Sequence, residues 1–311
     1  LRRPFFAFFV PFPKQFSLRR PAVLESTAAL WYPYAVFLCK GDDSVTKLRD
    51  KRLFLLDMDG TIYIGDRLFD GVPEFLHHVR AMGGRYLFLT NNSSRGVEGY
   101  MEKLRRMGIE TTRDDYLTSV DATVRYLRET LPGKTCYVFG TDSFLAQLDG
   151  AGIPVTRDRE QAEVLLCGFD TELTFQKLED ACILLNRGVP FVATNPDWVC
   201  PMPAGEVLPD CGSICALLTA ASGVKPTYIG KPNRNMVDVI SAQTGVPNEQ
   251  ICCVGDRLYT DIAVAVNAGA QSVLVMSGET DEAMLRASDV QPKYVLRDVA
   301  ELAQILRDGT V

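Results

Sequence analysis

The chain has 311 residues, of which 47% are hydrophobic and 23% are charged, and its formal net charge is −6. These proportions are ordinary for a soluble globular protein, and the length suffices for one large domain or two modest ones. The acidic balance argues against a nucleic-acid-binding protein that relies on a broad basic surface, but it does not exclude a small anionic substrate.

The first 47 residues differ from the rest of the chain. Residues 1–20 carry five basic side chains, no acid and a cluster of phenylalanines, and several prolines break any continuous helix. No apolar stretch reaches the roughly 20 residues that span a bilayer, and the uninterrupted apolar core of a signal peptide is missing. We expect residues 1–47 to be a poorly ordered or wrongly assigned leader. Weak attachment to a membrane surface through the Arg and Phe side chains is the alternative.

Nine cysteines occur, none of them in a Cys-x-x-Cys pair. Cys136, Cys167, Cys252 and Cys253 lie in apolar, strand-like runs, which is typical of small buried side chains in a reducing compartment. We therefore expect a cytoplasmic protein without a disulfide framework. A zinc site is not expected, because the only two histidines lie far along the chain from any cysteine.

The run Leu53–Leu56 has the length and bounds of a buried strand, and it ends at two carboxylates, Asp57 and Asp59. In open α/β sheets, ligand sites lie just beyond the carboxyl ends of such strands. Two carboxylates on one face repel each other unless a cation or a proton intervenes. The pair therefore indicates a hard metal ion such as Mg²⁺, although Asp-X-Asp-Gly also occurs in turns and calcium loops.

Beyond residue 60 the apolar pattern alternates between strands and helices. After a hairpin over Ile62–Leu68, strands are expected at Tyr86–Leu89, Cys136–Phe139, Val164–Phe169, Val189–Ala193, Ile251–Val254, Ser272–Val275 and Tyr294–Leu296. Helices are expected at Gly71–Met82, Gly96–Met107, Thr118–Leu131, Ser143–Asp149, Thr174–Asn186, Ile214–Ala221, Asn233–Thr244, Thr260–Ala268 and Val299–Leu306. This order predicts an α/β fold with a doubly wound, Rossmann-like parallel sheet.

Three further polar segments lie at predicted element ends. Thr90-Asn91-Asn92 offers a hydroxyl and backbone N–H groups, and Gly230-Lys231-Pro232 offers a cation just before a helix. Asp256 ends an apolar strand, and Asp261 follows about a helical turn later. Alone, Lys231 would be read as a surface lysine, and the two acids as a helix cap and a partner of the helix dipole. Together with the first acidic pair they supply acids for a metal and a hydroxyl and a cation for a phosphate.

In their order, these segments resemble the motifs of phosphatases of the haloacid dehalogenase (HAD) superfamily. Within it, the spacing and the middle block are similar to the NagD-like, 4-nitrophenylphosphatase-type branch (subfamily IIA), including Thr194-Asn195-Pro196-Asp197 and the segment 209–213. The resemblance runs from about residue 51 to the C-terminus. It implies a HAD-like hydrolase core over residues 48–131 and 227–311, interrupted by an inserted α/β cap domain over residues 132–226.

The resemblance also implies the chemistry. Asp57 would be the nucleophile and form an aspartyl-phosphate. Asp59 would protonate the leaving oxygen and then deprotonate the water that hydrolyses the intermediate. Mg²⁺ would be held by the carboxylates of Asp57 and Asp256 and by the backbone carbonyl of Asp59.

The remaining residues would bind the phosphoryl group. The resemblance implies that Thr90 and the backbone of Asn91 contact the phosphoryl oxygens, with Lys231 opposite. Asp261 would support the metal shell or orient Lys231. A cap over the site would exclude water until the substrate is in place.

We therefore expect Mg²⁺-dependent hydrolysis of small phosphomonoesters. A phosphotransferase of the same superfamily and a catalytically silent binding module on this fold are the alternatives. A dinucleotide-binding protein has less support, because no Gly-x-Gly-x-x-Gly follows a strand. The expected partner is a small phosphorylated metabolite, without a nucleic-acid polymer or a stable membrane span, and a homodimer is a candidate assembly.

The cap should decide the substrate, and there the sequence is less informative. Asn195, Asp197 and Trp198 are candidates to face the leaving group. The alternative, that Trp198 packs within the cap and Asp197 caps a turn, carries at least equal weight, so the three are not counted among the site residues.

Overall fold

The computed structural model describes residues 46–308. The predicted leader therefore lies outside the described residues, apart from its last two positions, where helix α1 (Thr46–Arg49) begins. Between residues 46 and 308 no helix is long and apolar enough to cross a membrane.

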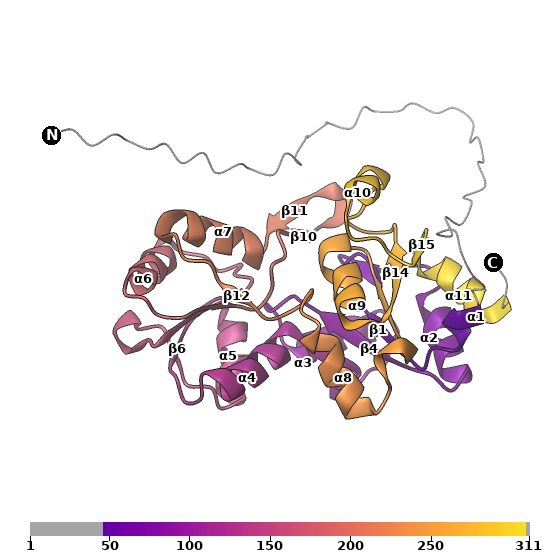
Figure 1. Cartoon of the computed structure of the whole chain (residues 1–311), viewed down its shortest axis with the longest axis horizontal. Coiled ribbons are helices and arrows are strands. Elements are labelled where there is room, and N and C mark those ends of the chain that lie inside the picture. Colours follow the sequence, from indigo (N-terminus) through magenta and orange to yellow (C-terminus); the bar gives the residue numbers. More distant parts are fainter. Residues whose placement is uncertain (1–45, 309–311) are drawn as a thin grey trace. The chain divides into compact units, whose positions relative to one another are not determined.

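A six-stranded parallel sheet organises the first and last thirds of the described chain. Its strands are β1 (Leu53–Leu56), β4 (Arg85–Thr90), β5 (Tyr116–Thr118), β13 (Ile251–Gly255), β14 (Gln271–Val275) and β15 (Tyr294–Leu296). They lie in the order β15-β14-β13-β1-β4-β5, so this sheet combines indigo and orange to yellow strands in Figure 1. From β1 the chain proceeds to one side through β4 and β5 and later to the other through β13. Strand β1 is thus at the topological switch point, where α/β sheets bind ligands.

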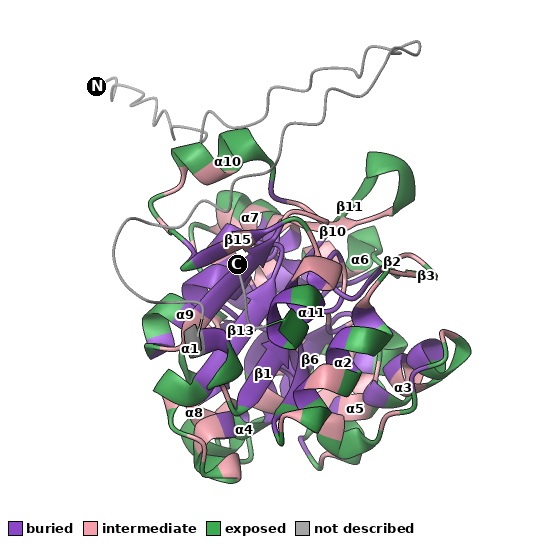
Figure 2. Cartoon of the chain, turned by 90° about the vertical axis from the view of Figure 1, so that its right-hand side faces the viewer, coloured by how far each residue is buried: buried purple, intermediate pink, exposed green. Residues whose placement is uncertain are grey.

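Helices cover both faces of this sheet: α2 (Val72–Ala81), α3 (Val97–Arg106), α8 (Asn235–Thr244), α9 (Ala263–Ala268) and α11 (Val299–Asp308). In β1 the side chains alternate. Phe54 and Leu56 pack in the apolar cluster of α2, α3 and α11, whereas Leu53 and Leu55 pack against α8 and α9. Figure 2 shows the buried strands beneath helices whose outer faces are exposed. Burial on two faces explains why β1 is apolar at every position.

A second, five-stranded parallel sheet occupies the middle of the chain. Its strands, in the order β12-β9-β8-β6-β7, are β6 (Cys136–Phe139), β7 (Val155–Thr156), β8 (Val164–Cys167), β9 (Phe191–Ala193) and β12 (Thr227–Tyr228). One face packs on α6 (Phe175–Asn186) and α7 (Cys211–Ser222), and the other packs on α4 (Ser119–Thr130) and α5 (Asp142–Gly150). The predicted α/β fold class is confirmed, since both sheets are parallel and flanked by helices.

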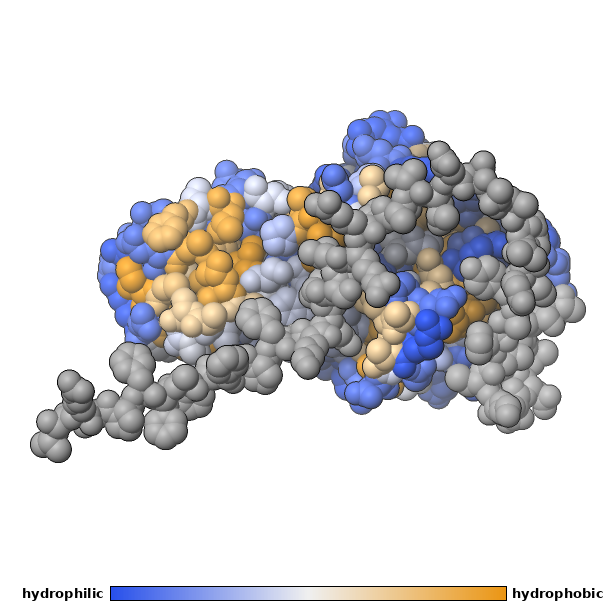
Figure 3. All heavy atoms as spheres, turned by 90° about the horizontal axis from the view of Figure 1, so that it is seen from above, coloured by the Kyte–Doolittle hydropathy of each residue, from blue (hydrophilic) through white to orange (hydrophobic). Residues whose placement is uncertain are grey.

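The chain passes between the two sheets close to the predicted domain boundaries. Helix α4 and strand β12, which the predicted division assigns to the core, pack on and pair with the second sheet. The division into domains itself stays a prediction. Exposed apolar side chains, among them Phe175 and Leu217, lie on α6 and α7 (Figure 3). The homodimer stays a prediction as well.

Two small antiparallel hairpins complete the architecture: β2–β3 (Tyr63–Ile64 and Arg67–Leu68) and β10–β11 (Val199–Pro201 and Val207–Pro209). The first was predicted. At its turn, a Cβ on Gly65 would lie 2.7 Å from the Pro203 ring, so the two hairpins are in contact. The predicted helix Thr260–Ala268 is a π-helical turn, Leu258–Ile262, followed by α9. Helix α10 (Glu282–Ala287) was not predicted.

Candidate active site

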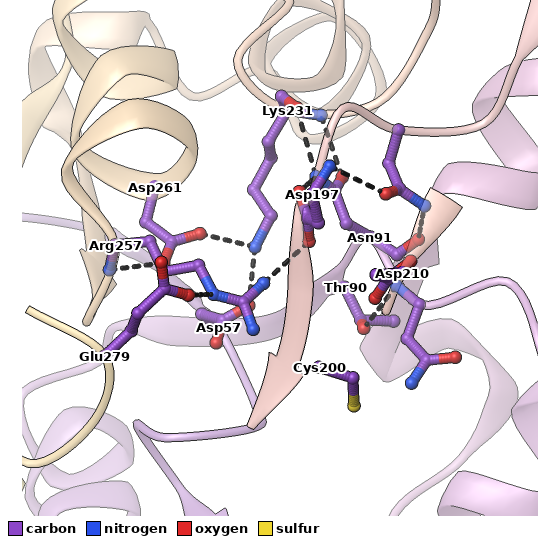
Figure 4. A network of polar contacts seen from close by, with 12 residues as sticks. Asp57, Thr90, Asn91, Asp197, Cys200, Asp210, Lys231, Arg257, Asp261 and Glu279 are labelled. Atoms are coloured by element: carbon purple, nitrogen blue, oxygen red, sulfur yellow. Dashed lines mark hydrogen bonds and ion pairs between the residues drawn. The ribbon is translucent and has the colours of Figure 1, made fainter. Parts of the chain in front are cut away.

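Three loops converge on one lysine at the carboxyl end of β1. The Nζ of Lys231 lies 2.5 Å from Oδ1 of Asp57 and 2.6 Å from Oδ1 of Asp261, and it donates a further hydrogen bond to the Leu89 carbonyl at 3.0 Å (Figure 4). All three charged side chains are buried. Burial acts to lower the pKa of Lys231, but Asp261 and Asp57 outweigh it and raise that pKa, so the lysine is charged.

Asp57, Asp256 and Asp261 form a buried carboxylate cluster, in which one oxygen of each lies within 4.8 Å of the others. Burial, followed by repulsion from Asp261, raises the pKa of Asp57 well above its ordinary value, although Lys231 opposes this. Burial likewise raises the pKa of Asp256 to about 6. Oδ2 of Asp57 is buried and has no hydrogen-bond partner among residues 46–308. The single positive charge of Lys231 therefore does not balance the negative charges of these three acids. A further cation would fit beside them.

Two glycines allow the chain to close around Asp256. A Cβ on Gly60, where φ is +94°, would lie 2.5 Å from Oδ2 of Asp256, and a Cβ on Gly278 would lie 2.0 Å from the same atom. The Glu279 N–H donates to this oxygen at 2.6 Å, and the Thr61 hydroxyl donates to the other oxygen at 3.3 Å. The Asp256 carboxylate is therefore held in one orientation.

Asp261 lies on the π-helical turn. Its second oxygen accepts from the Arg257 N–H at 3.0 Å, and Gly255 is required at its side because a Cβ there would lie 2.3 Å from that of Asp261. Single π turns recur at functional sites. Here the turn directs the carboxylate toward Lys231.

The carboxylate of Asp59 points away from this cluster, toward helix α3. Its Oδ1 lies 3.8 Å from Nζ of Lys103. Burial raises the pKa of Asp59, and Lys103 opposes the increase. Lys103 was missed by the sequence analysis. The available signal was its position between Tyr100 and Leu104, on the buried face of an amphipathic helix.

Thr90 is the last residue of β4 and Asn91 follows it, and both are buried. The Thr90 hydroxyl accepts from the Asn92 N–H at 3.2 Å. The Asn91 amide donates to Oδ1 of Asp197 at 2.8 Å and to the Lys231 carbonyl at 3.0 Å, and it accepts from the Lys231 N–H at 2.9 Å. The Asn91 side chain thus holds the Lys231 loop, and the phosphate contact of its backbone stays a prediction.

A buried ion pair joins the segment after β9 to the loop after β13. Oδ2 of Asp197 lies 2.6 Å from Nη1 of Arg257, whose Nε lies 2.7 Å from Oε2 of Glu279 (Figure 4). Burial raises the pKa of Asp197, and Arg257 opposes this. Arg257 was not predicted as a site residue, although it directly follows the predicted ligand Asp256.

The three candidates for the leaving group have different environments. Asp197 binds Asn91 and Arg257, and Asn195 donates to the Asn91 carbonyl at 2.7 Å. Trp198 is 47% exposed and lines a cavity of about 480 Å³ together with Tyr228 and Tyr259. Asn195 and Asp197 therefore hold Asn91 in place through hydrogen bonds. Their contact with a leaving group stays a prediction.

Replacement of Lys231 by Met should lower the free energy of unfolding of the metal-free protein by about 3–5 kcal/mol, because Asp57 and Asp261 lose their buried cation. A carboxyl group whose folded pKa is raised takes up a proton on folding, so its contribution to stability falls as the pH rises from about 4 toward the folded pKa. Without Lys231 the folded pKa of Asp57 would rise further. The loss should therefore be larger at about pH 8 than at about pH 5.

Urea unfolding of both proteins with a chelator present measures this difference. Lys134→Met is the matched control, because Lys134 forms an exposed pair with Glu163 and should change stability by less than about 1 kcal/mol. Equal losses for the two variants would contradict the stabilising role of Lys231.

Comparison with known proteins identifies the family. The profile of the haloacid dehalogenase-like hydrolases matches residues 54–154, and a HAD-hydrolase-like profile matches residues 228–302. The acid sugar phosphatase of Staphylococcus aureus (strain USA300) is 31% identical over 254 residues, which are 82% of this chain and 97% of that protein. The chain belongs to the haloacid dehalogenase-like hydrolases.

Solved structures of this hydrolase family agree. The 4-nitrophenylphosphatase of Thermotoga maritima is 40% identical with a TM-score of 0.78, over 83% of this hydrolase and 98% of that chain. A glycerol phosphate phosphatase of Mycobacterium tuberculosis, in complex with magnesium, is 28% identical with a TM-score of 0.75, over 83% and 76% of the two chains. The predicted superfamily, its branch and the predicted class of enzyme, a phosphatase, are confirmed.

Proposed function

We propose that this phosphatase hydrolyses small phosphomonoesters with Mg²⁺ as cofactor and Asp57 as the residue that is phosphorylated. The observation that carries the proposal is the environment of Asp57. One of its oxygens is bound by Lys231, and the other is buried and finds no hydrogen-bond partner in the described part of the chain. A carboxylate in that position can accept a bond to phosphorus.

The acids around Asp57 fit a divalent cation. Asp57 and Asp256 would hold Mg²⁺ with their carboxylates, and Asp59 would add its backbone carbonyl, which are the oxygen ligands that Mg²⁺ prefers. When bound, Mg²⁺ supplies positive charge that reduces the repulsion between the attacking carboxylate and the phosphate dianion. Burial raises the pKa of Asp256 to about 6, and a bound divalent cation would lower it again. The magnesium complex of the mycobacterial relative supports this assignment.

The reaction takes place in two displacements. An oxygen of Asp57 forms a bond to phosphorus while the bond to the leaving oxygen breaks, and the Asp59 carboxyl gives its proton to that oxygen. The Asp59 carboxylate then takes a proton from a water molecule, whose oxygen attacks the aspartyl-phosphate and releases inorganic phosphate. The raised pKa of Asp59 suits an acid that must be protonated in the first step.

Thr90, Asn91 and Lys231 bind the phosphoryl oxygens in this proposal. The Thr90 hydroxyl and the Asn91 backbone N–H lie at the end of β4, adjacent to β1, and Lys231 already touches Asp57. Such donors stabilise the charge that builds up in the transition state. Asp261 orients Lys231 through the 2.6 Å contact between them.

The relatives support small phosphomonoesters as substrates, because their names record a sugar phosphate, 4-nitrophenyl phosphate and glycerol phosphate. Release of phosphate from a panel of such esters tests the proposal. With Mg²⁺ present and no added acceptor, the amount of phosphate released should equal the amount of alcohol formed. A phosphotransferase would release less phosphate than alcohol once an acceptor alcohol is added, and no release from any ester would exclude the proposed function.

A further inference from the structure

We propose that Lys103 forms a leaving-group subsite, in which its ammonium group donates a hydrogen bond to the ester oxygen that Asp59 protonates. The inference rests on the proposed function, in which that oxygen lies beside the Asp59 carboxyl group. Because Nζ of Lys103 is 3.8 Å from Oδ1 of Asp59, one atom can contact both groups.

Lys103 is held in place by its surroundings. Helix α3 positions it in the second turn, on the same face as Tyr100, and the residue is only 7% exposed. Its Nζ lies 3.5 Å from the centre of the Tyr63 ring, in a cation–π contact. Tyr63 is itself fixed to the Asp59 loop, because its carbonyl accepts from the Gly60 N–H at 2.8 Å.

The ammonium group has unused hydrogen-bonding capacity. Within residues 46–308, Nζ makes the ion pair with Asp59 and the contact with the Tyr63 ring, but no hydrogen bond. An ammonium group has three N–H donors, so Lys103 can bind further acceptors. By contrast, Lys231 satisfies its Nζ with three oxygens. An acceptor supplied by the substrate would complete the environment of Lys103.

Further charged and polar groups surround the same point. Arg95 lies against α3, since a Cβ on Gly99 would lie 2.6 Å from its side chain, and it acts with burial to lower the pKa of Lys103. Burial, with a smaller contribution from Asp59, raises the pKa of the Cys200 thiol on strand β10. Because a Cβ on Gly65 would lie 2.7 Å from the Pro203 ring, the hairpins that carry Tyr63 and Cys200 lie side by side.

The subsite would act in the first displacement. The Asp57 oxygen bonds to phosphorus, the electron pair of the breaking bond goes to the leaving oxygen, and the Asp59 proton is transferred to it. Lys103 keeps its own protons and stabilises the negative charge on that oxygen before the proton arrives. The contribution of Lys103 to the rate grows with the basicity of the leaving group. The subsite thus suits esters of aliphatic alcohols more than those of acidic phenols.

A leaving-group series tests the inference. The values of kcat/KM are measured for 4-nitrophenyl phosphate, phenyl phosphate and an aliphatic phosphate that the wild-type enzyme hydrolyses. For Lys103→Met, kcat/KM should fall about 10²-fold with the aliphatic ester and less than about tenfold with 4-nitrophenyl phosphate. Lys103→Arg keeps the donors and the charge, so it should recover part of the loss with the aliphatic ester.

Arg105→Met is the matched control, because Arg105 lies on the same helix in an exposed pair with Glu102 and should leave the series unchanged. The Tm of Lys103→Met should be no lower than that of the wild type, since Met keeps the aliphatic stem and removes a poorly paired ammonium. Equal losses across the series, no loss, or a lowered Tm with uniform losses would overturn the inference. If the wild-type enzyme hydrolyses none of the esters, the proposed function fails instead.

Discussion

Asp57→Asn should reduce the turnover of 4-nitrophenyl phosphate by on the order of 10⁵-fold or more, because an amide cannot take the place of the attacking carboxylate. Acid quenching of the wild-type reaction followed by mass spectrometry should find one added phosphoryl group on the peptide that contains Asp57. The variant should show none. Unchanged turnover would exclude Asp57 as the nucleophile, and a phosphoryl group on another residue would move the chemistry there.

The loss of turnover in Asp57→Asn should occur without unfolding of the protein. Burial and Asp261 raise the pKa of Asp57, so its charged form is costly in the folded protein, and a neutral amide of the same shape removes this cost. Lys231 keeps its contact with Asp261. The Tm of Asp57→Asn in the presence of a chelator should therefore equal or exceed that of the wild type. Asp149→Asn, an exposed change on α5, is the control that should leave both turnover and Tm unchanged.

Strand patterning explains how much of the fold was predictable. Strand β1 has the predicted bounds, Leu53–Leu56, because a strand buried on both faces leaves a continuous apolar run with sharp ends. Strand β5 was missed, since three residues directly before a helix carry no periodicity. The hairpin β10–β11 was missed because Pro201 and Pro209 interrupt its strands.

Strand order also explains which site residues could be predicted from the sequence. Asp57, Thr90 and Asp256 follow parallel neighbouring strands, so their proximity follows from the order of the sheet. Lys103 and Asp197 reach the site through the packing of α3 and through the segment after β9, and these contacts do not follow from the order of the strands. Their burial as charged groups is visible only in the folded chain.

Removal of divalent metal should reduce turnover by about 10³-fold or more, and added Mg²⁺ should restore it. The physical reason is charge. Asp57 must approach a phosphate dianion in a site that already holds Asp256 and Asp261, with Lys231 as the cation that contacts Asp57 and Asp261. A bound divalent ion contributes several kcal/mol to such a transition state, and each 1.36 kcal/mol is about tenfold in rate. Full activity in a chelator would count against the metal site.

Binding can be measured without turnover. At a Mg²⁺ concentration about 100 times its Kd, the folded protein should gain about 2.7 kcal/mol, seen as an increase in Tm. Asp256→Asn should remove most of that increase, because it removes one of the two proposed carboxylate ligands. Metal binding requires the ionised carboxylate, and the pKa of Asp256 without metal is about 6. The Mg²⁺ concentration at half the Tm increase should therefore rise as the pH falls below about 6. An increase in Tm that is independent of pH and survives in Asp256→Asn would place the ion elsewhere.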